Sequence, residues 1–175
     1  MSNMQGYIDM VIPPLFRDST FENFEITTKQ QKTVIDVLKK TVTSLDMFNL
    51  VMLGNTQTGK NHLVCAFIRT YMEKYAKDVF YEKKKVLMTK ARKILAEIKD
   101  TFRNNKSEHE VLQKYINTDL LVINEIGLQF GTPTEMLYLT EIIDDRLEQM
   151  KSTVLISNLC LPELSKVLGQ RITER

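Results

Sequence analysis

Apolar and polar residues follow one another along the chain in blocks, and the blocks have two different spacings. Four short stretches are almost continuously apolar, which is typical of strands buried on both faces of a parallel sheet. These stretches are NLVML (49–53), KVLMT (85–89), LLVIN (120–124) and TVLIS (153–157). They predict four strands, and each is followed by a stretch with a longer spacing.

Between the strands, apolar residues recur every three or four positions, which indicates amphipathic helices. The expected helices cover 28–45, 60–76 and about 90–104, two more opened by the capping boxes SEHE (107–110) and TPTE (132–135), and a last one between Pro162 and Gly169. Strands separated by helices predict an α/β fold, a parallel sheet covered by helices on both faces. Within 90–104 the spacing favours Phe102 as a core residue.

The N-terminal stretch shows little periodicity, so residues 1–14 are expected to form an irregular segment before a single core over 15–175. A chain of 175 residues that is 43% apolar and 26% charged is ordinary for one globular domain. No apolar run approaches the ~18 residues of a membrane span, and the start lacks a signal-peptide pattern. These features predict a cytoplasmic protein without membrane association, with Cys65 and Cys160 as reduced structural thiols.

A phosphate-binding loop is predicted where the first strand meets a helix. Gly54, Gly59 and Lys60 match the pattern G-x-x-x-x-G-K, with an apolar strand before it and a helix starting at Lys60. Glycines let backbone N–H groups close around phosphate oxygens, and the helix N-terminus favours the negative charge. The expected nucleotide-binding residues are Gly54, Asn55, Thr56, Gln57, Thr58, Gly59, Lys60, Asn61 and His62. The alternative is a plain strand–turn–helix with a surface lysine.

Two asparagines stand where such loops usually carry metal-associated residues. Asn61 replaces the Ser/Thr hydroxyl that binds Mg²⁺, and Asn124 replaces the Asp at the end of LLVIN. Both keep an oxygen, so a weak Mg²⁺ site at Asn61 and Asn124 is expected, with slow hydrolysis. Glu125 is expected to orient and activate the attacking water, and Asn158 to reach the γ-phosphate from another strand end. A solvated carboxylate and a turn-forming Asn are the plainer alternatives.

Charge is unevenly distributed although the net formal charge is only +2. Between Lys83 and Lys106, nine Lys/Arg face two acids, Glu97 and Asp100, a local excess of +7 (nine minus two). A basic groove of this kind tracks a nucleic-acid backbone, and a solvated helix face is the alternative.

Several of these motifs together resemble a known family. GNTQTGKNHL, KDTFRN (99–104), LLVINEIG, EIIDDRL (141–147) and LGQRITER are similar to the AAA+ module of DnaC-type replicative helicase loaders, within the DnaC/IstB-like P-loop ATPases. The similarity runs from about residue 13 to the end. Asn after the loop lysine is characteristic of many such loaders, whereas Asn124 departs from their Asp–Glu pattern.

The resemblance implies ATP or ADP with Mg²⁺ as cofactors, and a replicative DnaB-type helicase and single-stranded DNA as partners. It implies that Lys60 and Glu125 serve ATP hydrolysis, that Asn158 is the sensor-1 residue, and that Arg171 is an arginine finger acting across a self-associated interface. The implied DNA-binding residues are Arg92, Lys93, Lys99, Phe102, Arg103 and Lys106.

Compared with that family, the chain is expected to lack the C-terminal strand and sensor-2 region and a separate N-terminal helicase-binding segment. The strand NLVML would then lie at an exposed sheet edge, which predicts self-association. Two other functions stay open: a degenerate nucleotide-binding regulator without turnover, and a transposition-type ATPase, whose loop usually ends in Lys-Thr.

Overall fold

The computed structural model describes residues 2–44, 47–75, 84–104, 107–127 and 132–170. Two compact units form: a helical unit of Met1–Asp46 and Gly59–Lys85, and a sheet unit of Met47–Thr58 and Val86–Arg175. A single core over 15–175 was expected, and that single-domain boundary stays a prediction.

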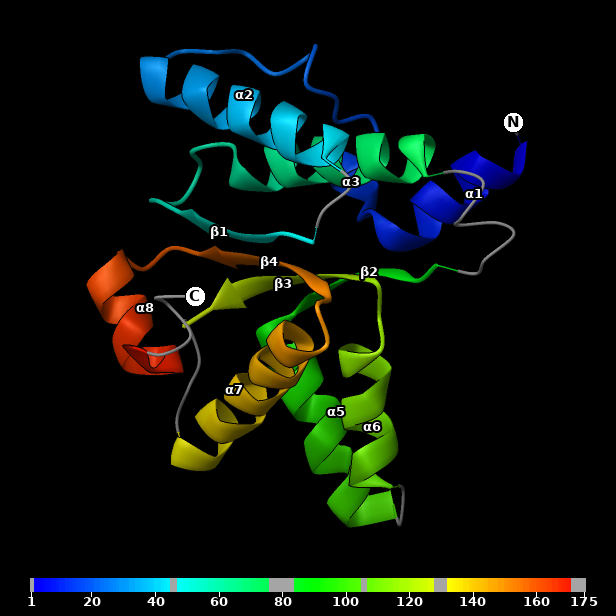
Figure 1. Cartoon of the computed structure of the whole chain (residues 1–175), viewed down its shortest axis with the longest axis vertical. Helices are drawn as coiled ribbons and strands as arrows, with labels where there is room; N and C mark the ends of the chain where they lie inside the picture. Colours follow the sequence, from blue (N-terminus) through cyan, green and yellow to red (C-terminus); the bar gives the residue numbers. More distant parts are fainter. Residues whose placement is uncertain (1, 45–46, 76–83, 105–106, 128–131, 171–175) are drawn as a thin grey trace. The chain divides into compact units, whose positions relative to one another are not determined.

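The sheet unit contains the four predicted strands. They are β1 (Asn49–Leu53), β2 (Val86–Lys90), β3 (Leu120–Ile126) and β4 (Ser152–Ser157). All pairings are parallel, in the order β1-β4-β3-β2 (Figure 1). The predicted parallel α/β sheet is therefore confirmed. Among the described residues β1 pairs with β4 alone, so it is an edge strand, and Val51 on it is 44% exposed.

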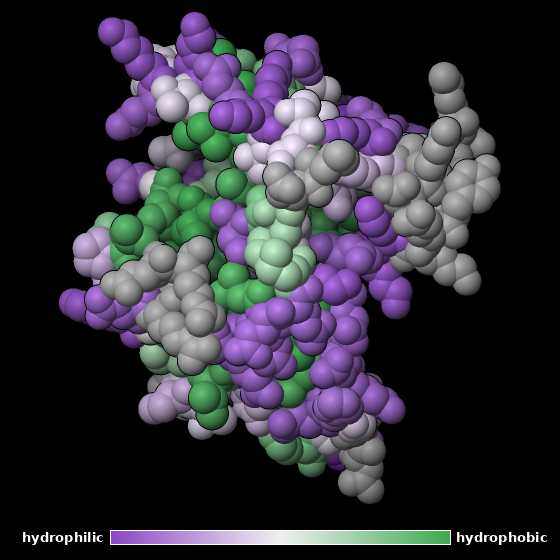
Figure 2. Space-filling view, in the orientation of Figure 1, coloured by the Kyte–Doolittle hydropathy of each residue, from purple (hydrophilic) through white to green (hydrophobic). Residues whose placement is uncertain are grey.

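Four helices belong to the sheet unit: α5 (Ala91–Asn104), α6 (Glu108–Ile116), α7 (Pro133–Glu148) and α8 (Leu161–Leu168). Figure 1 shows α5, α6 and α7 together below the sheet, and hydrophilic residues dominate their outer surface in Figure 2. The start of α7 is the predicted capping box, in which Thr132 and Glu135 cap each other's backbone N–H. Ser107 likewise accepts the N–H of Glu110 at the start of α6.

One core prediction on α5 is wrong. Ala91, Ile94, Leu95 and Ile98 are buried as expected, but Phe102 is 68% exposed. In the last turn the inward position is taken by Thr101, whose hydroxyl donates to the Ile98 carbonyl at 2.6 Å. A small residue that satisfies its own hydroxyl therefore ends the apolar stripe, and the ring remains on the surface.

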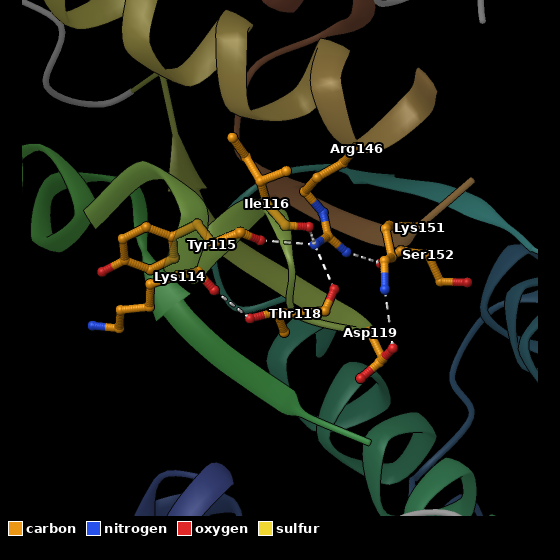
Figure 3. Close-up of polar contacts among 8 residues, drawn as sticks. All are labelled: Lys114, Tyr115, Ile116, Thr118, Asp119, Arg146, Lys151 and Ser152. Atoms are coloured by element: carbon orange, nitrogen blue, oxygen red, sulfur yellow. Dashed lines mark hydrogen bonds and ion pairs between the residues drawn. The ribbon is translucent and has the colours of Figure 1, made fainter. Parts of the chain in front are cut away.

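A fully buried arginine joins three elements of the sheet unit (Figure 3). Arg146, in the last turn of α7, donates to the Thr153 hydroxyl and to the carbonyls of Tyr115, Ile116, Thr118 and Ser152, at 2.5–3.0 Å. Two of these carbonyls end α6, where a helix has no backbone donors left for them. Burial lowers the pKa of Arg146 to about 10, and Asp119 opposes that shift. The guanidinium is thus an internal cap.

The helical unit holds α1 (Ser2–Val11), the short 3-10 turn η1 (Pro14–Phe16), α2 (Lys29–Thr43) and α3 (Lys60–Lys74). The expectation that residues 1–14 are irregular is wrong, because α1 is helical. Ile8 on α1 and Ile12, which directly follows the helix, are spaced by four and nearly fully buried, and α1 packs on α3. Two apolar residues in a short stretch gave too weak a periodicity to show this in the sequence.

The two predicted helices of this unit are confirmed, with shorter ends. Thr28 caps α2 in a full capping box with Gln31. Both cysteines are thiols outside any disulfide: Cys65 on α3 is buried, whereas Cys160 is exposed at the start of α8. Within the described ranges, no helix is both long and apolar enough to cross a membrane.

Candidate nucleotide-binding site

Three predicted site residues follow or end neighbouring strands of the sheet unit. Since the strands are parallel, their carboxyl ends meet at one edge, where open α/β sheets bind ligands. Gly54 follows β1, Asn158 follows β4, and Glu125 lies near the end of β3. The ladder aligns these ends, because Ser157 is the register partner of both Leu53 and Ile126. The order β1-β4-β3 thus places Asn158 between the loop start and the carboxylate.

The backbone of β3 is irregular at Glu125. Its φ is 61°, in the left-handed region, and the pairing with β4 shifts register between Ile123 and Ile126. The Ser157 hydroxyl donates to the Ile126 carbonyl at 2.7 Å and accepts the Leu159 N–H at 3.1 Å, which pins the bulge. Such a conformation costs on the order of 1 kcal/mol and collects at functional positions. The bulge turns the carboxylate out of the strand's regular alternation.

Glu125 is held by two neighbours. Asn124, which is 7% exposed, accepts the Glu125 backbone N–H on Oδ1 at 2.9 Å. The Lys90 ammonium lies 2.6 Å from Glu125 Oε1, because Lys90 ends β2 in register with Asn124. Lys90 is one of the nine basic residues between Lys83 and Lys106, and its role at Glu125 was not predicted. The available signal was a lysine directly after a strand that neighbours LLVIN.

The loop after β1 has the backbone that its glycines predict. Gly54, Gln57 and Gly59 have φ of 142°, 62° and 86°, and the Thr58 hydroxyl donates to the Asn55 carbonyl at 2.9 Å. Gly59 is the N-cap of α3 and has no side chain with which to cap it. Burial lowers the pKa of Lys60, the first residue of α3. The loop thus combines a glycine-containing turn, a helix N-terminus and a partly desolvated lysine. This combination has the chemistry of a phosphate site.

Comparison with known families decides the identification. The model of the IstB-like ATP-binding proteins matches residues 6–174. The chain belongs to this family. Membership carries nucleotide binding with it, and the predicted resemblance is confirmed.

Relatives of this IstB-like chain include the replicative helicase loader DnaC of Escherichia coli (strain K12). The two are 31% identical over 167 residues, covering 94% of this chain and 65% of the relative. The chain therefore spans less than two thirds of that relative's length.

Solved structures share the fold. The crystal structure of the DnaC helicase loader superimposes with a TM-score of 0.79 at 17% identity, covering 93% of each chain. Domain III of the replication initiation protein DnaA from Thermotoga maritima gives 0.75 at 19% identity, covering 93% of this chain and 64% of that one. The predicted α/β fold is thereby confirmed.

The basic residues predicted to bind DNA are spread over α5 of this IstB-like chain. Arg92, Lys93 and Arg103 are exposed, and Phe102 stands beside Arg103. Lys99 instead pairs with Glu135 at 2.5 Å, so its charge already has a partner. Lys106 and Arg171 lie outside the described residues.

Magnesium is expected from the resemblance to the helicase loaders, and the donor atoms present bear on whether it could bind. No cluster of three or more His, Cys, Asp or Glu suited to a metal occurs in the part of the chain that the structure describes. Mg²⁺ at nucleotide sites takes one or two protein oxygens together with phosphates and waters, so such a cluster is not required. The amide oxygens of Asn61 and Asn124 are neutral donors of the right kind. These donors would hold the ion weakly, because both are neutral and Asn124 Oδ1 already accepts the Glu125 N–H at 2.9 Å.

Proposed function

We propose that this protein binds ATP with Mg²⁺ and acts as a helicase-loader-like ATPase in DNA replication, with slow hydrolysis. The observation that carries the proposal is the carboxyl edge of the sheet, where the phosphate loop, Asn158 and Glu125 follow from β1, β4 and β3. Family membership over residues 6–174 supports the nucleotide part.

In this proposal each residue has a distinct role. Backbone N–H groups from Gly54 to Asn61 receive the phosphates, and the Lys60 ammonium neutralises the β/γ-phosphate charge. Glu125 orients the attacking water and accepts its proton, while Asn158 donates a hydrogen bond toward the γ-phosphate. Mg²⁺, when bound, would screen phosphate charge, and the amide oxygens of Asn61 and Asn124 are the side-chain donors proposed to hold it.

Two features make the proposed turnover slow. Asn124 has no negative charge with which to hold the ion's hydration shell, and Lys90 occupies the Glu125 carboxylate at 2.6 Å. The ammonium takes up a carboxylate oxygen that would otherwise be open to the attacking water. Hydrolysis then requires the ion pair to open.

The partners follow from the relatives, which are named replicative helicase loaders. We place a replicative helicase and single-stranded DNA as partners of this chain, the DNA on the exposed face of α5. Arg171 is proposed as an arginine finger that serves the nucleotide of a neighbouring copy.

A titration with a fluorescent ATP analogue tests the nucleotide part, with and without Mg²⁺. The wild type is expected to bind, more tightly with Mg²⁺, and Lys60→Ala to lose binding, since the ammonium and phosphates interact directly. Binding that ignores Lys60→Ala would contradict the site. Failure of the wild type to bind would end the ATPase proposal.

A second candidate is a nucleotide-binding regulator without turnover, favoured by the Lys90–Glu125 pair together with Asn124. Asn124→Asp separates the two. Aspartate has the same shape and still accepts the Glu125 N–H, so the bulge should persist. A rise in Mg²⁺-dependent hydrolysis of about tenfold or more is expected if the site is catalytic, within the range of acid–base effects. No hydrolysis in either protein would favour the regulator.

A further inference from the structure

The segment that precedes α2 is a compact turn within the helical unit. Asn23 Oδ1 accepts the Thr20 N–H at 2.9 Å, the Asn23 N–H donates to the Thr20 hydroxyl at 3.1 Å, and Asn23 Nδ2 donates to the Asp18 carbonyl at 2.7 Å. Side-chain bonds of this type hold a turn in one conformation. These bonds hold the segment from Asp18 to Asn23, which directly precedes Phe24.

The same turn is anchored on α2. Phe21 is buried, and the Lys39 ammonium lies 5.4 Å from the centre of its ring. Lys39 also pairs with Glu22 at 3.3 Å. The buried Phe21 ring and the Lys39–Glu22 ion pair thus attach the turn to α2, which begins at Lys29.

Phe24 reaches from this turn to the end of the phosphate loop. A Cβ built at Gly59 would lie 2.4 Å from Phe24 Cε2 and 2.7 Å from Cζ, so the ring edge rests directly against the glycine. Gly59 also has a φ of 86°, which L side chains rarely adopt. Two independent constraints therefore require glycine at this position.

His62 contacts both Phe24 and Thr20. Its ring meets Phe24 edge-on, with centroids 5.2 Å apart and planes at 62°. Its Nε2 lies 2.9 Å from the Thr20 carbonyl oxygen. Because a carbonyl only accepts, Nε2 carries the proton. His62 thus contacts both Thr20 and Phe24, and Phe24 rests against Gly59. We name Thr20, Phe24 and His62 the loop clamp.

We propose that Phe24 is a positioning residue of the phosphate loop, and this inference rests on the nucleotide binding proposed above. Glycine loses more conformational entropy than any other residue when its backbone is fixed. Because the Phe24 ring already restricts Gly59 and the first turn of α3 in the free protein, less entropy is lost when nucleotide binds. The backbone N–H groups that receive phosphate are then pre-organised, which raises affinity.

Nucleotide titration of Phe24 variants tests the clamp. Phe24→Ala is expected to weaken binding of the fluorescent ATP analogue by roughly ten- to a hundredfold, as misplacement of a binding group does. Phe24→Leu should weaken it less, and Phe24→Tyr should restore it. Tyr75→Ala, which removes a ring at the far end of α3, is the matched control and should bind like the wild type. Circular dichroism checks that each variant is folded.

A spectroscopic reading separates positioning from general destabilisation. The chain contains no tryptophan, so Phe24→Trp introduces a single indole, excited apart from the tyrosines, against Gly59. Nucleotide is expected to shift its emission, whereas Tyr75→Trp should stay silent. Wild-type affinity in Phe24→Ala, or a silent Phe24→Trp that still binds the analogue, would overturn the clamp and leave the proposed function intact. A wild type that binds no analogue would overturn both.

Discussion

At the residue scale, Lys90 decides how available the Glu125 carboxylate is. The two side chains meet at 2.6 Å and are 46% and 32% exposed, so solvent screens the pair and it opens at modest cost. An ion pair of this kind restrains a side chain without locking it. The pair is therefore suited to setting a rate and contributes little to stability.

Lys90→Met tests that role. Removing the ammonium frees Glu125 as a base, so kcat for ATP hydrolysis is expected to rise by about two- to tenfold, a small part of the usual effect of a general base. Affinity for the ATP analogue should stay unchanged. Lys166→Met, an exposed lysine on α8, is the control. A fall in kcat would mean that Lys90 itself supports the reaction.

At the element scale, α5 has two faces with different tasks. Ile94, Leu95 and Ile98 pack in the core of the sheet unit, while Arg92 and Arg103 are exposed on the outer face. Phe102 adds an exposed ring to this face, where a base can stack. The sequence favoured Phe102 as a core residue, but its ring is exposed and therefore available for the predicted contact with DNA.

Single-stranded DNA binding, followed by fluorescence anisotropy at several salt concentrations, tests this face. Phe102→Ala is expected to cost about 1–3 kcal/mol, the value of one stacked base. Arg103→Ala should reduce the salt dependence by about one phosphate contact. Lys99→Ala should have less effect, because Lys99 pairs with Glu135. Equal effects of all three would contradict the assignment.

A second prediction at this scale concerns the packing of α5 on α6. Burial raises the pKa of Glu97, but hydrogen bonds from Lys114 at 2.7 Å and Tyr115 at 2.8 Å outweigh it and leave the pKa below its ordinary value. A carboxyl with a lowered folded-state pKa stabilises the fold above its unfolded pKa, and that stabilisation is lost as the pH falls through the folded one.

Urea unfolding at a series of pH values measures this contribution. The wild type is expected to lose stability below about pH 4.5, where the unfolded carboxyl begins to protonate. Glu97→Gln should show a smaller loss over the same range and lower stability near neutral pH. Parallel pH profiles would show that Glu97 does not contribute.

The elements themselves were largely predictable, because strand runs and helical stripes are local signals. The four strands, the capping box before α7 and the loop glycines needed only neighbours in sequence. Three roles were missed because each depends on a partner far away in the sequence. Lys90 lies 35 residues from Glu125, Arg146 up to 31 from its partners, and Phe24 35 from Gly59. A lone Lys, Arg or Phe has no periodicity from which such a partner can be inferred.

At the scale of the whole molecule, Arg146 is expected to contribute strongly to the free energy of unfolding, because its hydrogen bonds connect α7, α6 and β4. Arg146→Met is expected to destabilise the protein by roughly 3–5 kcal/mol, since it leaves several buried carbonyls without a donor. Urea unfolding measures it, with Lys32→Met on the exposed side of α2 as a control that should change stability by about 0.5 kcal/mol or less. A near-neutral Arg146→Met would mean that water replaces the guanidinium.

The division into two units also bears on how such a protein changes over evolution. The helical unit is discontinuous in sequence, since Met47–Thr58 between its two parts belongs to the sheet unit. A single genetic crossover therefore never exchanges one unit intact. A chimera that swaps one unit needs joints at three places, and one of them falls between Thr58 and Gly59, inside the phosphate loop. The two halves of that loop would then descend from different parents, so we expect the units to be inherited together.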